Sequence, residues 1–253
     1  MGDRRTDVVA RCEELFALVT SGRSESWDDL RKLLPELNEV CAAGRHDAQA
    51  LLGGICLELL GDTANALRLF EASAAGDWPA GQRGLGHMLA SGAGVERDPA
   101  RARSLFERAA AAGDAFAAFN LASILRREGG DDERVIELLG RASSGGVAEA
   151  SVALASRAEG KEEARRLYAL AAEHGSAEAM PVLAAWCRDG VGGPVDPVQA
   201  VRWFLSMLDH GDGDGVHEAI ALARTMEVED IRLAANLAGR PADGDALIHA
   251  AKK

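Results

Sequence analysis

A motif of small residues around a glycine recurs six times along this chain of 253 residues. In each copy the glycine is followed by a segment rich in alanine or other small residues. The spacing is close to the period of about 34 residues that helix–turn–helix repeats have. Such a repeat predicts helix pairs that bury their apolar faces against one another. The six glycines are Gly44, Gly76, Gly113, Gly146, Gly175 and Gly215.

Apolar residues within each copy recur at helical spacing. The first helix places a large residue beside a small one, as in Leu52-Gly53 and Leu121-Ala122. The large side chain fills the groove between helices, and the small one lets the neighbour approach. No segment alternates as a strand does. Second helices show apolar residues at i, i+3, i+4 and i+7, as in Ala102, Leu105, Phe106 and Ala109. By position we expect the core to include Trp27, Trp78, Trp186 and Trp203.

Two copies contain a longer internal turn, within residues 91–102 and 189–200. In each, an aspartate precedes a proline. We therefore predict Asp98 and Asp196 as helix N-caps, with a proline at the first helical position. The turn begins with glycine-x-glycine, and valine and this aspartate follow. A later alanine, an aromatic position and a closing Ala-Ala-x-x-Gly complete the pattern, which resembles the Sel1-like repeat. This family is related to the tetratricopeptide repeats, and the resemblance extends over about residues 44 to 222.

The expected fold is all-α, a right-handed α-solenoid of antiparallel helix pairs. We expect five to six repeats over residues 44–226 in one continuous domain, with helical caps at 1–43 and 227–253, because terminal repeats otherwise expose an apolar face. The predicted cap helices cover residues 7–20, 26–43, 228–238 and 245–251. Three cap residues have assigned roles: Ser26 as an N-cap, Pro35 as a kink or restart of its helix, and Pro241 as the break between the last two helices.

Composition excludes several functional classes. The chain has 28 basic and 40 acidic residues, and this net charge of −12 argues against nucleic-acid binding, which requires a clustered cationic surface. No segment is long and apolar enough to cross a membrane. The N-terminal segment lacks the apolar core of a secretory signal, and the four cysteines are irregularly spaced, so we expect a cytoplasmic location with reduced, buried thiols.

Motifs for catalysis and metal binding are each incomplete. His217-Glu218 lacks the second histidine of a zinc-protease helix, and residues 209–215 lack the closing glutamate of a calcium loop. Cys41, His46 and Cys56 match no zinc-ligand spacing, so core packing is the expected role of both cysteines. We therefore expect no catalytic residue, no metal site, no cofactor and no enzymatic activity.

Surface recognition is the function that this fold favours. The resemblance implies that first helices line a concave face that holds an extended ligand. Peptide-binding tetratricopeptide units, which this segment resembles, have an asparagine that binds the ligand backbone at the position of Asn120, immediately before Leu121. Arginine recurs at the expected concave positions, and guanidinium groups bind carboxylates in a forked geometry. The hypothesis is an adaptor that binds a protein or peptide, acidic or carboxylate-terminated. The predicted contact residues are Arg83, His87, Asn120, Ser123, Arg126, Arg127, Ser156, Arg188 and Arg224.

Other interpretations remain open from the sequence. Of the 28 basic residues, 24 are arginines, so a general preference for arginine would place it on any solvated helix face. An inhibitory or immunity-type protein would use its acidic outer surface against a basic target. A small-ligand regulator or an enzyme would need a pocket in the superhelix, for which Arg83, His87 and Asn120 are the candidate lining.

Overall fold

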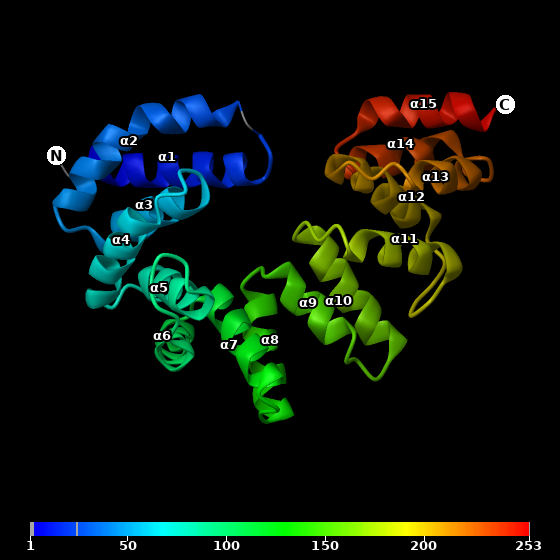
Figure 1. The fold of residues 1–253 in the computed structure, drawn as a ribbon. Helices are drawn as coiled ribbons and strands as arrows, with labels where there is room; N and C mark the ends of the chain where they lie inside the picture. Colours follow the sequence, from blue (N-terminus) through cyan, green and yellow to red (C-terminus); the bar gives the residue numbers. More distant parts are fainter. Residues whose placement is uncertain (1–2, 24, 253) are drawn as a thin grey trace. The chain divides into compact units, whose positions relative to one another are not determined.

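The computed structural model of the chain describes residues 3–23 and 25–252, and none of these residues lies in a strand. Residues 1, 2, 24 and 253 of the predicted caps lie outside the described residues. The chain forms two units, Met1–Asp131 and Asp132–Lys253, and each is described by itself. Both are built from consecutive helices packed in antiparallel pairs (Figure 1). The fold is therefore an all-α solenoid, as predicted.

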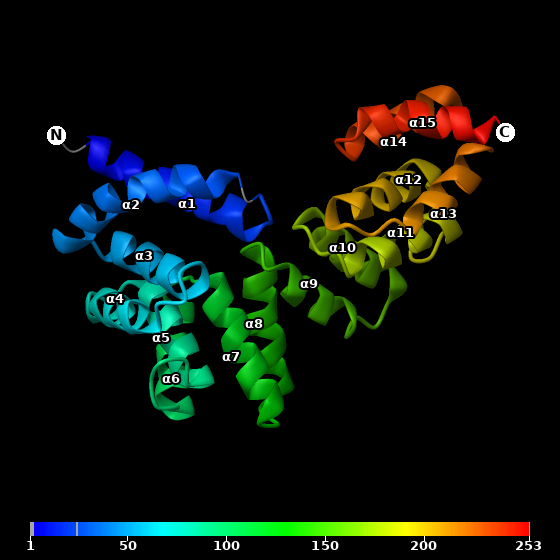
Figure 2. The same cartoon turned by 45° about the horizontal axis from the view of Figure 1, so that its top comes forward.

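Unit 1 contains seven helices in its described residues. The second view shows the same succession of helices along the chain (Figure 2). Four of them, α1, α3, α5 and α7, are the first helices of successive helix pairs along the chain, and α1 lies in the segment predicted as the N-terminal cap. The bounds are α1 Asp3–Thr20, α2 Ser26–Ala42, α3 His46–Glu58, α4 Thr63–Ala75, α5 Pro79–Ser91, α6 Pro99–Ala111 and α7 Ala115–Arg127.

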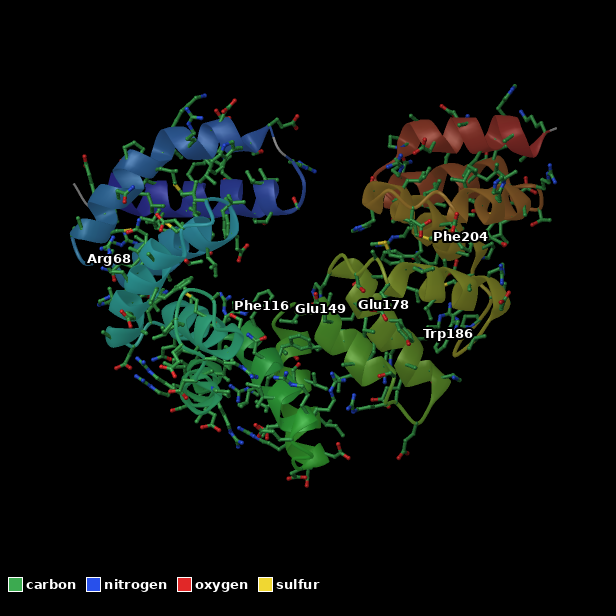
Figure 3. The ribbon with its side chains drawn as sticks, in the orientation of Figure 1. Arg68, Phe116, Glu149, Glu178, Trp186 and Phe204 are labelled. Carbon is green, nitrogen blue, oxygen red and sulfur yellow. The ribbon has the colours of Figure 1, made fainter. Side chains whose placement is uncertain are left out.

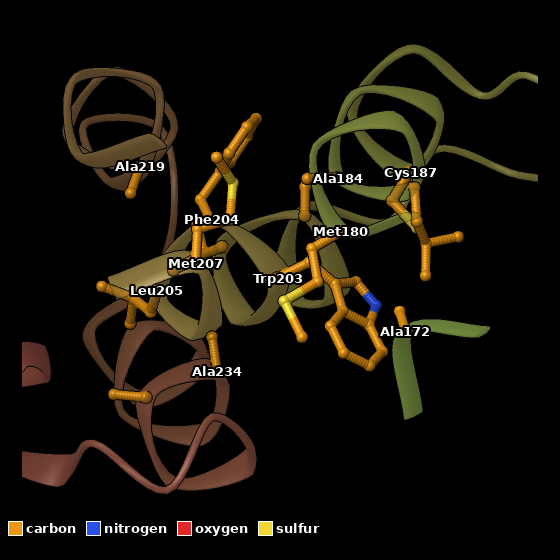
Figure 4. Packing of buried hydrophobic residues seen from close by; sticks show 14 of the residues in the cluster. Ala172, Met180, Ala184, Cys187, Trp203, Phe204, Leu205, Met207, Ala219 and Ala234 are labelled. Carbon is orange, nitrogen blue, oxygen red and sulfur yellow. The ribbon is translucent and has the colours of Figure 1, made fainter. Parts of the chain in front are cut away.

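Unit 2 continues the alternation with eight α-helices and one short 3-10 helix. Its helices are α8 Asp132–Ser144, α9 Ala148–Ala155, α10 Lys161–Glu173, α11 Ala179–Asp189, α12 Pro197–Ser206, η1 Met207–His210, α13 Gly215–Ala223, α14 Val228–Leu237 and α15 Pro241–Ala251. Helices α12, α14 and α15 bury Trp203, Ile231 and Leu247 in one core. Figure 4 shows the part of this core around Trp203, Phe204 and Ala234. Figure 4 also shows Trp203 beside Met180 of α11.

Small residues let the helices of unit 1 approach aromatic rings. A Cβ atom at Gly84 would lie 2.3 Å from the ring of Phe70, and one at Gly86 would lie 2.9 Å from the ring of Phe106. Both distances are shorter than carbon atoms allow, so each glycine gives its space to the aromatic residue of a second helix. The predicted pairing of large and small residues thus has a direct structural counterpart.

Left-handed glycines end most of the second helices, as the repeat predicts. Gly44, Gly113, Gly146 and Gly175 all have positive φ. Gly76 does not: Asp77 takes the left-handed conformation with φ 58°, and a Cβ at Gly76 would lie 2.2 Å from His46 Nε2.

The last copy of the motif also departs from the prediction. Gly211, with φ 75°, ends η1, while Gly215 begins α13, where a Cβ would lie 2.9 Å from the carbonyl oxygen of Phe204. At Gly215 the sequence motif therefore marks a close approach of two segments instead of the end of a second helix, whereas Gly76 is both the C-cap of α4 and a point of close approach.

The long turns have the predicted caps. Asp98 Oδ1 accepts a hydrogen bond from the N–H of Arg101 at 2.9 Å, and Asp196 Oδ1 accepts one from the N–H of Gln199 at 3.0 Å. Pro99 and Pro197 are the first residues of α6 and α12. These turns return the chain from a first helix to the second helix of the same repeat.

The cap predictions need three corrections. Ser26 is the first residue of α2 instead of its N-cap, which is Glu25. α2 does not restart at Pro35 but continues through it to Ala42, so only the predicted restart is wrong. α15 begins at Pro241 instead of residue 245, because proline is well suited to the first helical turn.

Candidate functional site

A pocket of about 550 Å³ lies among the first helices of unit 1. It is lined by side chains of α1, α3, α5 and α7, with the ring of Phe70 from α4 at its base. The pocket is within the range of volumes typical of ligand sites. It therefore provides unit 1 with a hollow on the face where first helices gather.

Three of the predicted contact residues line this pocket: Arg83, His87 and Asn120. Arg83 is already engaged, because its Nε donates to Asp114 Oδ2 at 3.0 Å. His87 is exposed and Asn120 is half-buried. These three residues, which were proposed from the sequence as the lining of one pocket, therefore do line one pocket. The structure adds a carboxylate partner for the arginine.

Carboxylates outnumber cations in the lining. Glu13 and Glu58 are exposed, and Asp47 is half-buried. Burial favours the neutral form of Asp47, but hydrogen bonds from the Arg45 guanidinium and the N–H of Ala48 outweigh it and lower the pKa of that carboxyl. The carboxylate is therefore charged near neutral pH, and the pocket offers negative charge beside its apolar base.

Exposed aromatic side chains flank the pocket. Trp78, a lining residue, is 43% exposed, and Phe116 on α7 is 53% exposed. The Arg83 guanidinium carbon lies 5.3 Å from the centroid of the Phe116 ring, within cation–π distance. Figure 3 labels Phe116 on α7. Trp78 was predicted in the core and is not there, because it precedes α5 at a turn.

The other predicted residues of unit 1 lie further along α7. Ser123 is half-buried, while Arg126 and Arg127 are exposed at the end of the helix. Arg127 lines a separate hollow of about 200 Å³ together with Arg97 and Glu128. Arg126 and Arg127 are thus outside the lining of the larger pocket.

In unit 2 the predicted residues occur at three separate helix ends. The Ser156 hydroxyl donates to the carbonyl of Ala153 at 2.9 Å, next to the end of α9. The Arg188 guanidinium forms ion pairs with Asp189 and, at 2.7 Å, Glu218, and these acceptors raise its pKa. Arg224 is exposed directly after α13.

Chemical groups elsewhere are consistent with structural roles. All four cysteines are unpaired and buried, and burial raises the pKa of Cys41 to about 12. Among the described residues, no three histidine, cysteine, aspartate or glutamate side chains are grouped so that they could hold a metal ion. No described helix has the length and apolarity required to cross a membrane.

Exposed aromatic residues were the main feature that the sequence analysis missed. Trp78 precedes a proline at the start of α5, and Phe116 follows an N-cap aspartate by two residues. Positions at the beginning of a first helix are less enclosed than those in the middle. The position of Trp78 and Phe116 at the start of a first helix is therefore the feature of the sequence that could have predicted their exposure.

Comparison with known proteins identifies the class as a helical repeat protein. The Sel1 repeat family matches residues 79–114, 160–176 and 177–212. These segments include both long turns. These three segments of the chain are therefore Sel1 repeats.

Solved structures with the same architecture support this assignment at the level of the fold. One is a protective antigen present in uropathogenic Escherichia coli strains, which displays an SLR fold. It matches with a TM-score of 0.60 and 24% identity over 87% of this chain and 50% of its own. A second, a Sel1 repeat protein from Oxalobacter formigenes, has a TM-score of 0.57 and 20% identity, over 81% and 97% of the two chains. The present chain thus spans half the length of the antigen, and no curated protein matches it.

Proposed function

We propose that this protein is a non-enzymatic interaction module, an adaptor that holds a peptide segment of a protein partner against its first helices. The observation that carries the proposal is the unit 1 pocket, which combines Arg83, His87 and Asn120 with the exposed ring of Trp78. Sel1 repeats generally mediate protein interactions, and a preformed pocket binds with little ordering cost on the protein side. The four buried, unpaired thiols suit the proposed cytoplasmic location.

The pocket favours a segment with an apolar anchor. Its base contains Phe70 and Leu51, and Trp78 adds an exposed aromatic surface. Aromatic side chains in a hollow are typical centres of protein recognition. Asn120 can donate to and accept from ligand backbone, because its amide carries both kinds of group.

Acidic groups of the partner are proposed to bind outside the pocket. Glu13 and Glu58 make the pocket itself unfavourable for a carboxylate. Arg126 and Arg127 are exposed at the end of α7 and remain the proposed binding residues for an acidic or carboxylate-terminated segment. Ser123 lies between them and Asn120 on the same helix, and Ser156, Arg188 and Arg224 are the proposed contacts of unit 2.

Affinity capture from native lysate, followed by mass spectrometry, tests the proposal with two double variants. His87→Ala/Asn120→Ala alters the pocket, and Arg126→Glu/Arg127→Glu reverses the charges at the end of α7. We expect each to lose the same partner while the melting temperature stays nearly unchanged, because these side chains make few contacts within the fold.

The matched control is Arg68→Glu/Arg101→Glu, which makes the same charge change on exposed residues of α4 and α6. It is expected to retain the partner. Loss from the control alone would move the interaction to the second helices. Loss from the pocket variant alone would keep the pocket and remove the charge-sensing arginines from the proposal.

A further inference from the structure

A second pocket, of about 770 Å³, lies on the second-helix side of unit 2. Its walls are α10 and α12, one edge is the long turn with Gly192 to Pro194, and Leu183 and Cys187 of α11 contribute to its base. This volume suits a small molecule. The pocket is distinct from the unit 1 pocket, and the inference stands independently of the proposed function.

Three arginines converge on this pocket: Arg165 and Arg166 from α10 and Arg202 from α12. Two carboxylates, Glu162 and Glu173, also line it, and both are exposed. None of the three guanidinium groups forms an ion pair with a described residue. Arginines elsewhere, such as Arg103 and Arg240, each pair with two carboxylates. The feature that distinguishes these three arginines is that they line one pocket together, while none of them has an ion-pair partner among the described residues.

Arg165 is held rigidly by neutral acceptors. Its Nη1 donates to the carbonyls of Val191 at 3.3 Å and Pro194 at 3.0 Å, and its Nη2 donates to Cys187 Sγ at 3.3 Å. These bonds orient the guanidinium but leave its charge uncompensated. A fixed cation binds an anion with little loss of side-chain freedom.

Arg202 is also oriented without a carboxylate. Its guanidinium carbon lies 4.1 Å from the centroid of the Trp203 ring, which is itself only 4% exposed. Nη1 donates to Gln199 Oε1 at 3.1 Å, while the buried Nε has no acceptor. Arg166, the residue next to Arg165 on α10, is exposed. Two fixed cations and one movable cation therefore face the same volume.

The equivalent repeat in unit 1 shows that the fold does not require this cluster. Residues of the two long-turn repeats correspond at a constant spacing, with Asp98 equivalent to Asp196. By that correspondence, Leu67 stands where Arg165 is and Ser104 where Arg202 is. The repeat thus forms with an apolar and a small polar residue at these positions, so the two arginines of unit 2 call for another explanation.

We propose that the unit 2 pocket binds the phosphate group of a small phosphorylated molecule. A phosphate carries up to two negative charges and three strong acceptor oxygens, which suits several guanidinium groups better than a single carboxylate does. A phosphorylated protein side chain offers the same group, but the apolar residues of the lining, Ala169, Leu183 and Trp203, fit the apolar part of a small molecule.

Isothermal titration calorimetry with pyrophosphate, succinate and a phosphoserine peptide tests this proposal on the full chain. We expect pyrophosphate to bind with a Kd below 1 mM at low ionic strength, and at least tenfold more tightly than succinate or the peptide. Arg202→Ser and Arg166→Ala should each weaken pyrophosphate binding about tenfold. Arg166 makes no contact that the fold needs, so its variant stays informative if Arg202→Ser is unstable.

The control is Arg68→Ser/Arg101→Ser, which removes two exposed charges from unit 1 and should leave the affinity unchanged. Absence of pyrophosphate binding at 5 mM, or equal weakening by the control, would overturn the proposal, the latter because it shows only a general charge effect. Tighter binding of the phosphoserine peptide than of pyrophosphate would overturn the small-molecule assignment.

Discussion

The two long-turn repeats, α5–α6 in unit 1 and α11–α12 in unit 2, have the same turn geometry and different side chains around the turn. Gly92 and Gly190 both end their first helices in the left-handed conformation, with φ of 79° and 72°. The N–H of Asp98 donates to Leu89 O at 2.9 Å, and the N–H of Asp196 donates to Cys187 O at 2.8 Å. The residues of the repeat motif therefore specify a turn, and positions outside the motif specify what surrounds it.

Different arginines hold the two turns in place. In unit 1, Arg97 within the turn donates from Nε to the carbonyl of Ala90 at 3.0 Å. In unit 2, Val195 occupies that place, and Arg165 of the preceding α10 bonds to two turn carbonyls instead. The same loop is thus fixed from inside in one repeat and from a neighbouring helix in the other. Because Arg165 holds the turn in unit 2, its guanidinium group lies in the lining of the unit 2 pocket.

The largest expected effect is at the second glycine of each turn. A Cβ at Gly192 would lie 2.2 Å from the backbone oxygen of Lys161, whereas one at Gly94 would lie 2.7 Å from the side chain of Thr63. The contact at Gly192 is therefore the closer one, and it involves the carbonyl group of Lys161, whose carbon would lie only 2.6 Å away. We expect Gly192→Ala to cost about 3 kcal/mol of unfolding free energy and Gly94→Ala about 2, including the left-handed strain common to both.

Urea unfolding measures this difference, and Gly175→Ala is the control. Gly175 has φ 84° and open space around its missing Cβ, so only the conformational cost of about 1 kcal/mol applies. An equal loss for Gly94→Ala and Gly192→Ala would show that the two turns contact their preceding helices in the same way.

A smaller effect is expected from exchanging the residues that hold the turns. Arg165→Leu introduces the unit 1 residue and removes three hydrogen bonds, so it should lower the unfolding free energy by about 2 kcal/mol. Arg97→Val introduces the unit 2 residue, removes one exposed hydrogen bond and should cost about 0.5 kcal/mol. Alkylation of Cys187, which is faster if the turn loosens, reports the same change locally. A larger loss of unfolding free energy for Arg97→Val than for Arg165→Leu would contradict the conclusion that Arg165 holds its turn more strongly than Arg97 does.

The smallest difference is expected at the caps, where the repeats are alike. Asp98→Ala and Asp196→Ala each leave one N–H at the start of a helix without its side-chain acceptor. Each should cost about 1 kcal/mol, and the two values should agree within about 0.5 kcal/mol. Thermal unfolding of the two variants is the measurement. A clear inequality would mean that the two turns differ in more than their side chains.

The sequence predicts the repeated part of this fold well because its signals are local. An aspartate before a proline, a glycine after an alanine-rich helix, and a leucine beside a small residue each act within one or two helical turns. The predicted caps at Asp98 and Asp196 are confirmed for this reason. Pro35 was harder to place, because whether a proline interrupts a helix depends on which side of that helix faces solvent.

The candidate sites were only partly predictable. Arg83, His87 and Asn120 share a pocket because each occupies a regular position on a first helix. The ion pair of Arg83 with Asp114 and that of Arg188 with Glu218 join residues about one repeat apart, which a pattern within a single repeat does not show. The arginines of the unit 2 pocket likewise come from second helices of consecutive repeats.

Photo-crosslinking in native lysate tests the central claim, that a partner binds on the first-helix side of unit 1. A photoreactive residue replaces either His87 of α5 or Ser104 of α6, both of which are exposed and lie in the same repeat. The proposed pocket predicts a discrete crosslinked partner from position 87 and none from position 104. A partner crosslinked from position 104 and absent from position 87 would contradict it.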